Sequence, residues 1–273
     1  MVGKLIKHEA IRTSGMLLTI FGAATLLVAL GALASATRWP VVAQIGLVGA
    51  LVGTVGVLVG TQLAMGIDYW RSSYRRIGYF TQTLPVKGST IYWAKLAWAA
   101  IAVVMGLVWA GVLGVLTFMG NATSIGYRPL DVFSLVGDWF SAAADVLPWW
   151  GWVAGPAIVL VYLMFPVVQY FFAASIGSER RLVSLGVGGP VLVWFLLYVV
   201  MQVTLLLGMI AIPFGLTVSD GRMALVGQNF LQLMLDDSQP GSMPIGFVPV
   251  LLVALVMLVW RTTVSWNRKV TLA

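Results

Sequence analysis

Long uncharged apolar runs, separated by short charged segments, make up most of this sequence. Cutting the chain at every charged residue leaves six long runs, at residues 13–37, 39–67, 96–127, 146–178, 182–219 and 238–260. Each has at least 23 residues, and a helix needs about 20 residues to cross the hydrocarbon core of a bilayer. The next longest run, 223–235, has only 13 residues. The pattern therefore predicts six membrane-spanning helices, at about 16–37, 42–66, 92–119, 151–176, 183–212 and 246–264.

The charged segments between the runs predict an orientation. With six spans both termini lie on one side, which would carry thirteen Lys and Arg against three acids. The other side would carry three Arg against six Asp. Because cytoplasmic segments of membrane proteins are enriched in Lys and Arg, we expect both termini in the cytoplasm. The predicted fold is an all-α polytopic membrane protein, with a single transmembrane domain over residues 1–273.

Composition excludes several other classes of protein. Charged residues make up 9% of the chain, against roughly 25% in a soluble domain. The net charge of +7 is spread over membrane-proximal segments, whereas nucleic-acid binding needs basic residues clustered on one face. The absence of cysteine excludes disulfides and thiolate metal sites. The first apolar run is longer than the core of a signal peptide, so we expect a retained helix.

Three amphipathic segments outside the runs predict short helices. Residues Gly3–Thr13 would form an interfacial helix lying flat on the inner leaflet. Asp131, Asp138 and Asp145 repeat every seven residues and predict an outer helix between spans three and four. The segment 223–235 predicts a short outer helix or re-entrant turn between spans five and six.

The segment from Asp68 to Lys95 is the longest polar interruption on the basic side, and it carries five basic residues against one acid. Trp70 and Tyr74 would share one helical face, with Arg71 and Arg75 on another. These spacings predict a short cytoplasmic helix between spans two and three, where we expect the chain to meet a partner. Anchoring to membrane lipid is the alternative role of this loop.

The spans themselves hold little chemistry. No Asp, Glu, Lys, Arg or His lies near the middle of a predicted span, although ion-coupled carriers keep an ionisable residue there. Metalloprotease ligands, a base for a serine nucleophile and a phosphate-binding P-loop are also missing from the sequence. We therefore expect no enzymatic activity, no metal site and no cofactor bound by this chain.

Glycines and amides are the remaining features of the spans. Five glycines in the second span form a stripe that another helix could approach closely: Gly46, Gly49, Gly53, Gly56 and Gly60. Packing within the chain is favoured over a subunit interface. Three amides either line a polar cavity or are buried and satisfied by neighbouring backbone: Gln62, Gln169 and Gln202.

The basic loop resembles a known family. Gly78-Tyr79-Phe80-Thr81-Gln82-Thr83-Leu84-Pro85-Val86, followed by Ile91 and Lys95, is similar to the Gly-Tyr-Leu-Thr-x-Thr-Leu-Pro-Val…Lys signature of exporter-type (type 2) ABC transporter permeases. Leu5-Ile6-Lys7-His8-Glu9 resembles the Lys-x-Glu opening of the same proteins. Phe80 replaces the commoner Leu, and the loop holds more Arg than acid.

The resemblance implies the permease subunit of an ABC exporter in a prokaryotic cell membrane, for multidrug or antimicrobial-peptide efflux. Its partners would be a second permease copy, identical or not, and a separate P-loop ATPase that binds ATP and Mg²⁺. The substrate would be hydrophobic or amphipathic, such as a peptide antibiotic, a drug or a lipid-like molecule. The alternative is a non-transporting membrane scaffold or immunity-type binding protein.

The resemblance also implies roles for particular residues. The main ATPase-coupling contacts would be Trp70, Arg71, Tyr74, Arg75, Arg76, Gly78 and Tyr79, and the minor ones Glu179 and Arg180. The elbow that carries motion into span three would comprise Thr81, Thr83, Leu84, Pro85 and Lys95.

Overall fold

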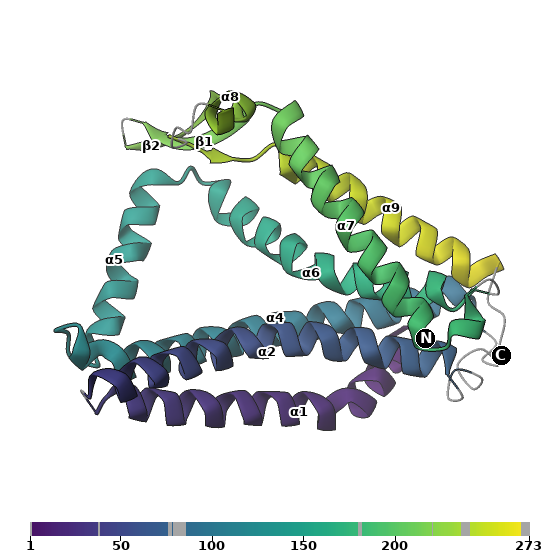
Figure 1. The fold of residues 1–273 in the computed structure, drawn as a ribbon, viewed down its shortest axis with the longest axis horizontal. Helices are drawn as coiled ribbons and strands as arrows, with labels where there is room; N and C mark the ends of the chain where they lie inside the picture. The colour runs from purple at the N-terminus through teal and green to yellow at the C-terminus, as the bar shows by residue number, and fades with distance from the viewer. Residues whose placement is uncertain are drawn as a thin grey trace. The chain divides into compact units, whose positions relative to one another are not determined.

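The computed structural model describes residues 2–37, 39–75, 78, 86–179, 182–219, 221–235 and 241–268. Among these residues, six helices are long and apolar enough to cross a membrane. They are α1 (Val2–Ser35), α2 (Pro40–Tyr74), α4 (Gly88–Asn121), α6 (Gly151–Gly177), α7 (Gly188–Ala211) and α9 (Phe247–Arg268) (Figure 1). The predicted number of long apolar helices is confirmed; the side on which the termini lie stays a prediction.

The smaller elements lie between these helices. They are the 3-10 helices η1 (Ala122–Ser124) and η2 (Val183–Leu185), the helices α5 (Asp131–Val146) and α8 (Phe230–Leu235), and the strands β1 (Phe214–Ser219), β2 (Arg222–Gly227) and β3 (Met243–Pro244). Helix α5 occupies the segment in which the aspartate repeat predicts a helix. Its placement on the outer side stays a prediction.

The chain divides into two compact units, Met1–Phe140 and Ser141–Ala273. In the first unit α1, α2 and α4 pack against one another in pairs, and Figure 1 shows them running side by side. Small and medium apolar side chains form the centre of this bundle: Ala24, Val28, Ala50, Val57, Ala110 and Leu113. We call the end where α1 begins, α2 ends and α4 begins the basic end.

Helices α1 and α2 cross at very short range. A Cβ atom built on Gly31 would lie 2.5 Å from the carbonyl oxygen of Gly46, and one built on Gly53 would lie 2.7 Å from Val28 Cγ2. Only hydrogen atoms fit in these gaps, so the two backbones touch at Gly31 and Gly46, and the Val28 side chain packs on the backbone at Gly53. In a bilayer, such close packing is a principal source of helix association because lipid already solvates apolar side chains.

The glycine stripe of α2 divides into two sets. Gly46, Gly53 and Gly60 face α1, whereas a Cβ atom on Gly49 or Gly56 would meet nothing within 4 Å. The favoured interpretation, packing within the chain, is therefore correct for three of the five glycines.

Three helices extend further at the basic end than the predicted spans. The interfacial segment Gly3–Thr13 is continuous with the first span in α1, and the residues Asp68 to Tyr74 are the last turns of α2. The predicted N-terminal helix is therefore not separate from the first span, and Asp68 to Tyr74 belong to α2 rather than to a loop after it. The interfacial position of residues 3–13 stays a prediction, as does a coupling helix between spans two and three, most of whose remaining residues lie outside the described ones. The α1 helix of 34 residues is about 51 Å long, and the hydrocarbon core is about 30 Å thick. The extra turns remain helical because their charges pair with one another, as described below.

In the second unit α6 packs against α7 and α9, and α7 packs against α9. The start of α7 lies directly on the end of α6, since a Cβ atom on Gly177 would fall 2.3 Å from the Pro190 nitrogen. Helix α7 ends at Ala211. Pro213 lacks the N–H that a further turn needs and disfavours a helical conformation at Ile212, which has φ −111° and ψ 89°.

A small antiparallel sheet follows α7, with strand order β2-β1-β3. Strand β1 pairs with β2 from Phe214 opposite Gly227 to Ser219 opposite Arg222. The turn between them contains Gly221 at a φ of +70°, a conformation that glycine adopts without steric cost. The prediction of an all-α chain missed this sheet. Within 223–235, only Phe230–Leu235 is helical.

Candidate functional site at the basic end of the first unit

Four charged side chains from three helices meet at the basic end. Lys95 Nζ, near the start of α4, donates to Glu9 Oε1 of α1 at 2.9 Å and to Ser72 Oγ of α2 at 2.8 Å. Arg12 of α1 donates to both carboxylate oxygens of Asp68 in α2, at 3.2 Å from Nε and 2.5 Å from Nη2. The same guanidinium also donates to the Glu9 carboxylate. We call Glu9, Arg12, Asp68 and Lys95 the ionic network.

The ionic network is electrically balanced, with two acids and two bases. Lys95 is 3% exposed and Glu9 is 8% exposed, so both have lost most of their water. A buried charge is costly unless it is paired and hydrogen-bonded, and both conditions hold for Lys95. The planar guanidinium of Arg12 meets the Asp68 carboxylate through two parallel hydrogen bonds, the strongest geometry of this pair.

Two further contacts join the helices beside the network. Trp98 Nε1 of α4 donates to Thr13 Oγ1 of α1 at 2.9 Å, and the same hydroxyl donates to the Glu9 carbonyl oxygen at 2.9 Å. Tyr69 of α2 and Tyr92 of α4 are almost fully buried, with ring centres 6.4 Å apart in an edge-on arrangement. These contacts bind all three helices together at the basic end.

The network holds both ends of the basic loop. Asp68 and Ser72 lie in the first part of this loop, which continues α2, and Lys95 is its last residue, within α4. Gly78 donates its N–H to the Arg75 carbonyl at 2.7 Å. A Cβ atom on Gly78 would lie 2.5 Å from the Ser73 carbonyl oxygen. Glycine is therefore required at this position for steric reasons.

The predicted coupling residues within the described segment lie at the end of α2. Trp70 and Tyr74 are half-buried, while Arg71 and Arg75 are exposed. The guanidinium of Arg75 lies 4.6 Å from the centre of the Trp70 ring, a cation–π contact. Helical spacing predicted that Arg75 and Trp70 lie on different faces. Arg75 lies just beyond the last helical residue, in an extended conformation, so helical spacing does not apply to it and its side chain reaches the Trp70 ring.

Several predicted site residues lie outside the described residues, and their roles stay predictions. They are Arg76, Tyr79, Thr81, Thr83, Leu84, Pro85 and Arg180.

Glu179 holds together one end of the second unit. Its Oε1 accepts hydrogen bonds from Arg261 Nη2 and from Ser265 Oγ, each at 2.9 Å. The carboxylate thus joins the residues after α6 to α9. Its predicted role as a minor coupling contact stays a prediction.

Replacing Glu179 with glutamine should lower the free energy of unfolding by about 1–2 kcal/mol, because a neutral amide cannot pair with the Arg261 charge. Ser265→Ala should cost less, about 1 kcal/mol, because only one hydrogen bond to the carboxylate is lost. Equilibrium unfolding in mixed detergent micelles, titrated with dodecyl sulfate, measures both. Asp145→Asn, a change at an exposed acid, is the control. An equal effect of Asp145→Asn and Glu179→Gln would contradict a stabilising role for the contacts of Glu179 with Arg261 and Ser265.

The three amides divide between the two units. Gln62 is buried in the first unit, Gln169 is buried in the second, and Gln202 is exposed on α7. Their role in lining a cavity stays a prediction.

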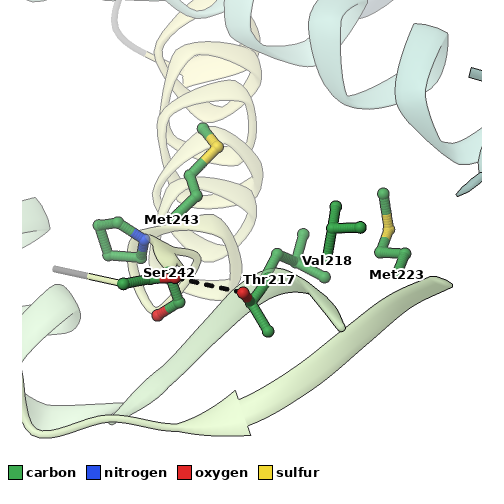
Figure 2. Close-up of a pocket in the computed structure, with 8 residues that line it drawn as sticks. Thr217, Val218, Met223, Ser242 and Met243 are labelled. Atoms are coloured by element: carbon green, nitrogen blue, oxygen red, sulfur yellow. Dashed lines mark hydrogen bonds between the residues drawn. The ribbon is translucent and has the colours of Figure 1, made fainter. Parts of the chain in front are cut away.

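A shallow pocket of about 620 Å³ lies against the small sheet. Figure 2 shows Val218, Met223 and Met243 among its lining residues, with Thr217 Oγ1 donating to the Gly241 carbonyl at 3.2 Å. None of its lining residues belongs to the predicted site.

Sequence reasoning missed the ionic network, apart from Lys95. One signal was available: the basic side of the chain holds only three acids, Glu9, Asp68 and Glu179. All three form ion pairs in the structure.

Comparison of the chain with protein-family models, with curated proteins and with solved structures finds no match.

Proposed function

We propose that this chain is the membrane-spanning subunit of an exporter that is driven by a separate P-loop ATPase. The observation that supports this most is the ionic network, which attaches both ends of the basic loop to the start of α1. The loop carries the motif that is similar to exporter-type ABC permeases. The proposed cargo is hydrophobic or amphipathic, and a second permease copy completes the transporter in the cell membrane.

Force applied to the loop would reach three helices together. Asp68 receives it at the end of α2 and passes it to α1 through Arg12, while Lys95 receives it at the start of α4 and passes it to Glu9. Because hydrogen-bonded ion pairs fix both distance and direction, the basic end would move as one body. In this proposal the first unit responds to ATP binding in the partner as a rigid lever.

The docking surface would be the last turn of α2 together with Arg75, the residue that follows it. Arg71 and Arg75 are exposed there, and Arg75 lies on the half-buried ring of Trp70. Two cations beside an aromatic ring favour an acidic or aromatic groove on the ATPase, since complementary charges guide and orient association.

Purification in mild detergent from the native host, followed by an ATPase assay, tests this function. The double variant Arg71→Glu, Arg75→Glu should lower co-purified, vanadate-sensitive ATPase turnover by at least about 10-fold, because each reversed charge would oppose its acidic partner. Arg222→Glu is the matched control, since Arg222 is also exposed but lies in β2 of the second unit.

A chain that purifies without any P-loop protein would contradict the proposal and favour the scaffold or binding function. Equal losses in the double variant and in Arg222→Glu would contradict docking at the end of α2.

A further inference from the structure

An apolar groove of about 430 Å³ runs between α1 and α4 beside the ionic network. Ile11, Ser14, Leu18 and Phe21 line it from α1, and Trp98 and Met105 line it from α4. The indole N–H of Trp98 is already bonded to Thr13, so this side chain offers the groove an apolar ring. Ile11 is 66% exposed and Leu18 is 71% exposed. The described residues of the first unit thus leave the groove uncovered.

Two lysines continue the groove toward the start of α1. Positions 4, 7, 11, 14, 18 and 21 follow spacings of three and four residues, which place them on one face of a helix. Lys4 and Lys7 therefore lie on the face that carries Ile11, Ser14 and Leu18. Both lysines are exposed, and among the described residues no acid forms an ion pair with either.

The neighbouring charges do not cancel these two lysines. Glu9 and Asp68, the acids of the first unit at this end, are both bound within the ionic network. That network is neutral by itself. The entrance of the groove consequently carries two uncompensated positive charges.

The dimensions of the groove match one leaflet of a membrane. From Ile11 to Phe21 a helix rises about 15 Å, which is half of a hydrocarbon core of about 30 Å. Lys7 lies one turn beyond Ile11, at the level where a lipid headgroup would follow its chain. An apolar channel with cations at its mouth complements an anionic amphiphile.

We propose that this groove binds an acyl chain of an anionic phospholipid, whose headgroup lies against Lys4 and Lys7. The site does not depend on the proposed export function, because it uses neither the loop motif nor a partner ATPase. Bound there, the lipid covers the exposed side of the contact between Trp98 and Thr13 and joins α1 to α4 next to the ionic network.

Native mass spectrometry of the full-length chain, titrated with phosphatidylglycerol and with phosphatidylcholine of identical acyl chains, tests the site. One basic residue near an anionic headgroup contributes about a fivefold gain in affinity. The wild-type chain should therefore bind phosphatidylglycerol on the order of 25-fold more tightly than phosphatidylcholine. The double variant Lys4→Gln, Lys7→Gln should lose this preference. Lys87→Gln, which removes another exposed lysine of the basic end, should retain it.

A second pair of variants tests the groove itself. Ser14→Trp fills it and should weaken binding of both lipids, whereas Thr19→Trp should not. Ser14 and Thr19 are matched, since both are exposed and both hydroxyls donate to a carbonyl of their own helix at 2.9 Å. Equal binding of the two lipids by the wild-type chain, or an equal loss of preference in Lys87→Gln, would overturn the proposal. So would unchanged binding in Ser14→Trp. Thermal unfolding of each variant verifies that it is folded.

Discussion

Replacing Glu9 with leucine should destabilise the first unit by about 3–5 kcal/mol, the usual cost of removing one partner from a buried ion pair. Lys95 is 3% exposed, and among the described residues Glu9 is the one acid that forms an ion pair with its ammonium group. Ser72 remains as a hydrogen-bond acceptor, but a hydroxyl cannot balance the charge. Arg12 would keep its contact with Asp68, so the loss falls mainly on Lys95. Dodecyl sulfate titration followed by circular dichroism measures the change.

The double variant Glu9→Leu, Lys95→Met is the decisive control. Replacing both members of a buried ion pair by apolar side chains is often neutral, so most of the lost stability should return. His8→Leu changes the exposed neighbour of Glu9 and should have almost no effect. If the double variant were as unstable as Glu9→Leu alone, the pair between Glu9 and Lys95 would not be the source of the destabilisation.

Replacing Gly46 with valine should lower the free energy of unfolding by about 3 kcal/mol, at the upper end of overpacking costs. A Cβ atom at Gly46 would lie 2.6 Å from the Gly31 carbonyl oxygen and 2.6 Å from the Ser35 nitrogen. Both are backbone atoms, which cannot turn aside as a side chain can. The helices α1 and α2 would have to separate.

Gly49→Val is the matched control, because the same substitution three residues further along α2 meets nothing within 4 Å. It should change stability by less than about 1 kcal/mol. The same detergent unfolding measurement applies to both variants. A loss at Gly49 as large as at Gly46 would contradict the assignment of Gly46, rather than Gly49, to the tight crossing.

The existence of the six long helices could be predicted from the sequence. A run of more than 20 residues without charge has few ways to satisfy its backbone in a membrane, and the α-helix does so with contacts inside the segment. Local information is therefore sufficient. The end of α7 before Pro213 is predictable for the same reason, since the proline ring acts on its own helix.

The small sheet could not be predicted in the same way. Strand β1 lies inside the apolar run 182–219, where run length alone cannot separate strand from helix. Strand β2 is stabilised by hydrogen bonds to β1. The pairing of two strands depends on the sequences of both segments, so the periodicity of residues 223–235 alone cannot predict it.

The boundaries at the basic end were decided by tertiary contacts. Glu9, Arg12 and Asp68 resemble ordinary surface charges when the sequence is read alone, so the predicted spans exclude them, whereas Lys95 lies inside the predicted span 92–119. Once α1, α2 and α4 pack together, the four charges neutralise one another and their turns remain helical.

The sequence by itself determined the number and the apolar character of the helices, because both follow from interactions within each segment. The tertiary structure alone decided which glycines of α2 face α1 and which charges lie inside the bundle. Those properties depend on atoms contributed by other helices. Gly46 and Gly49 are chemically identical on α2, and only the position of α1 makes them different.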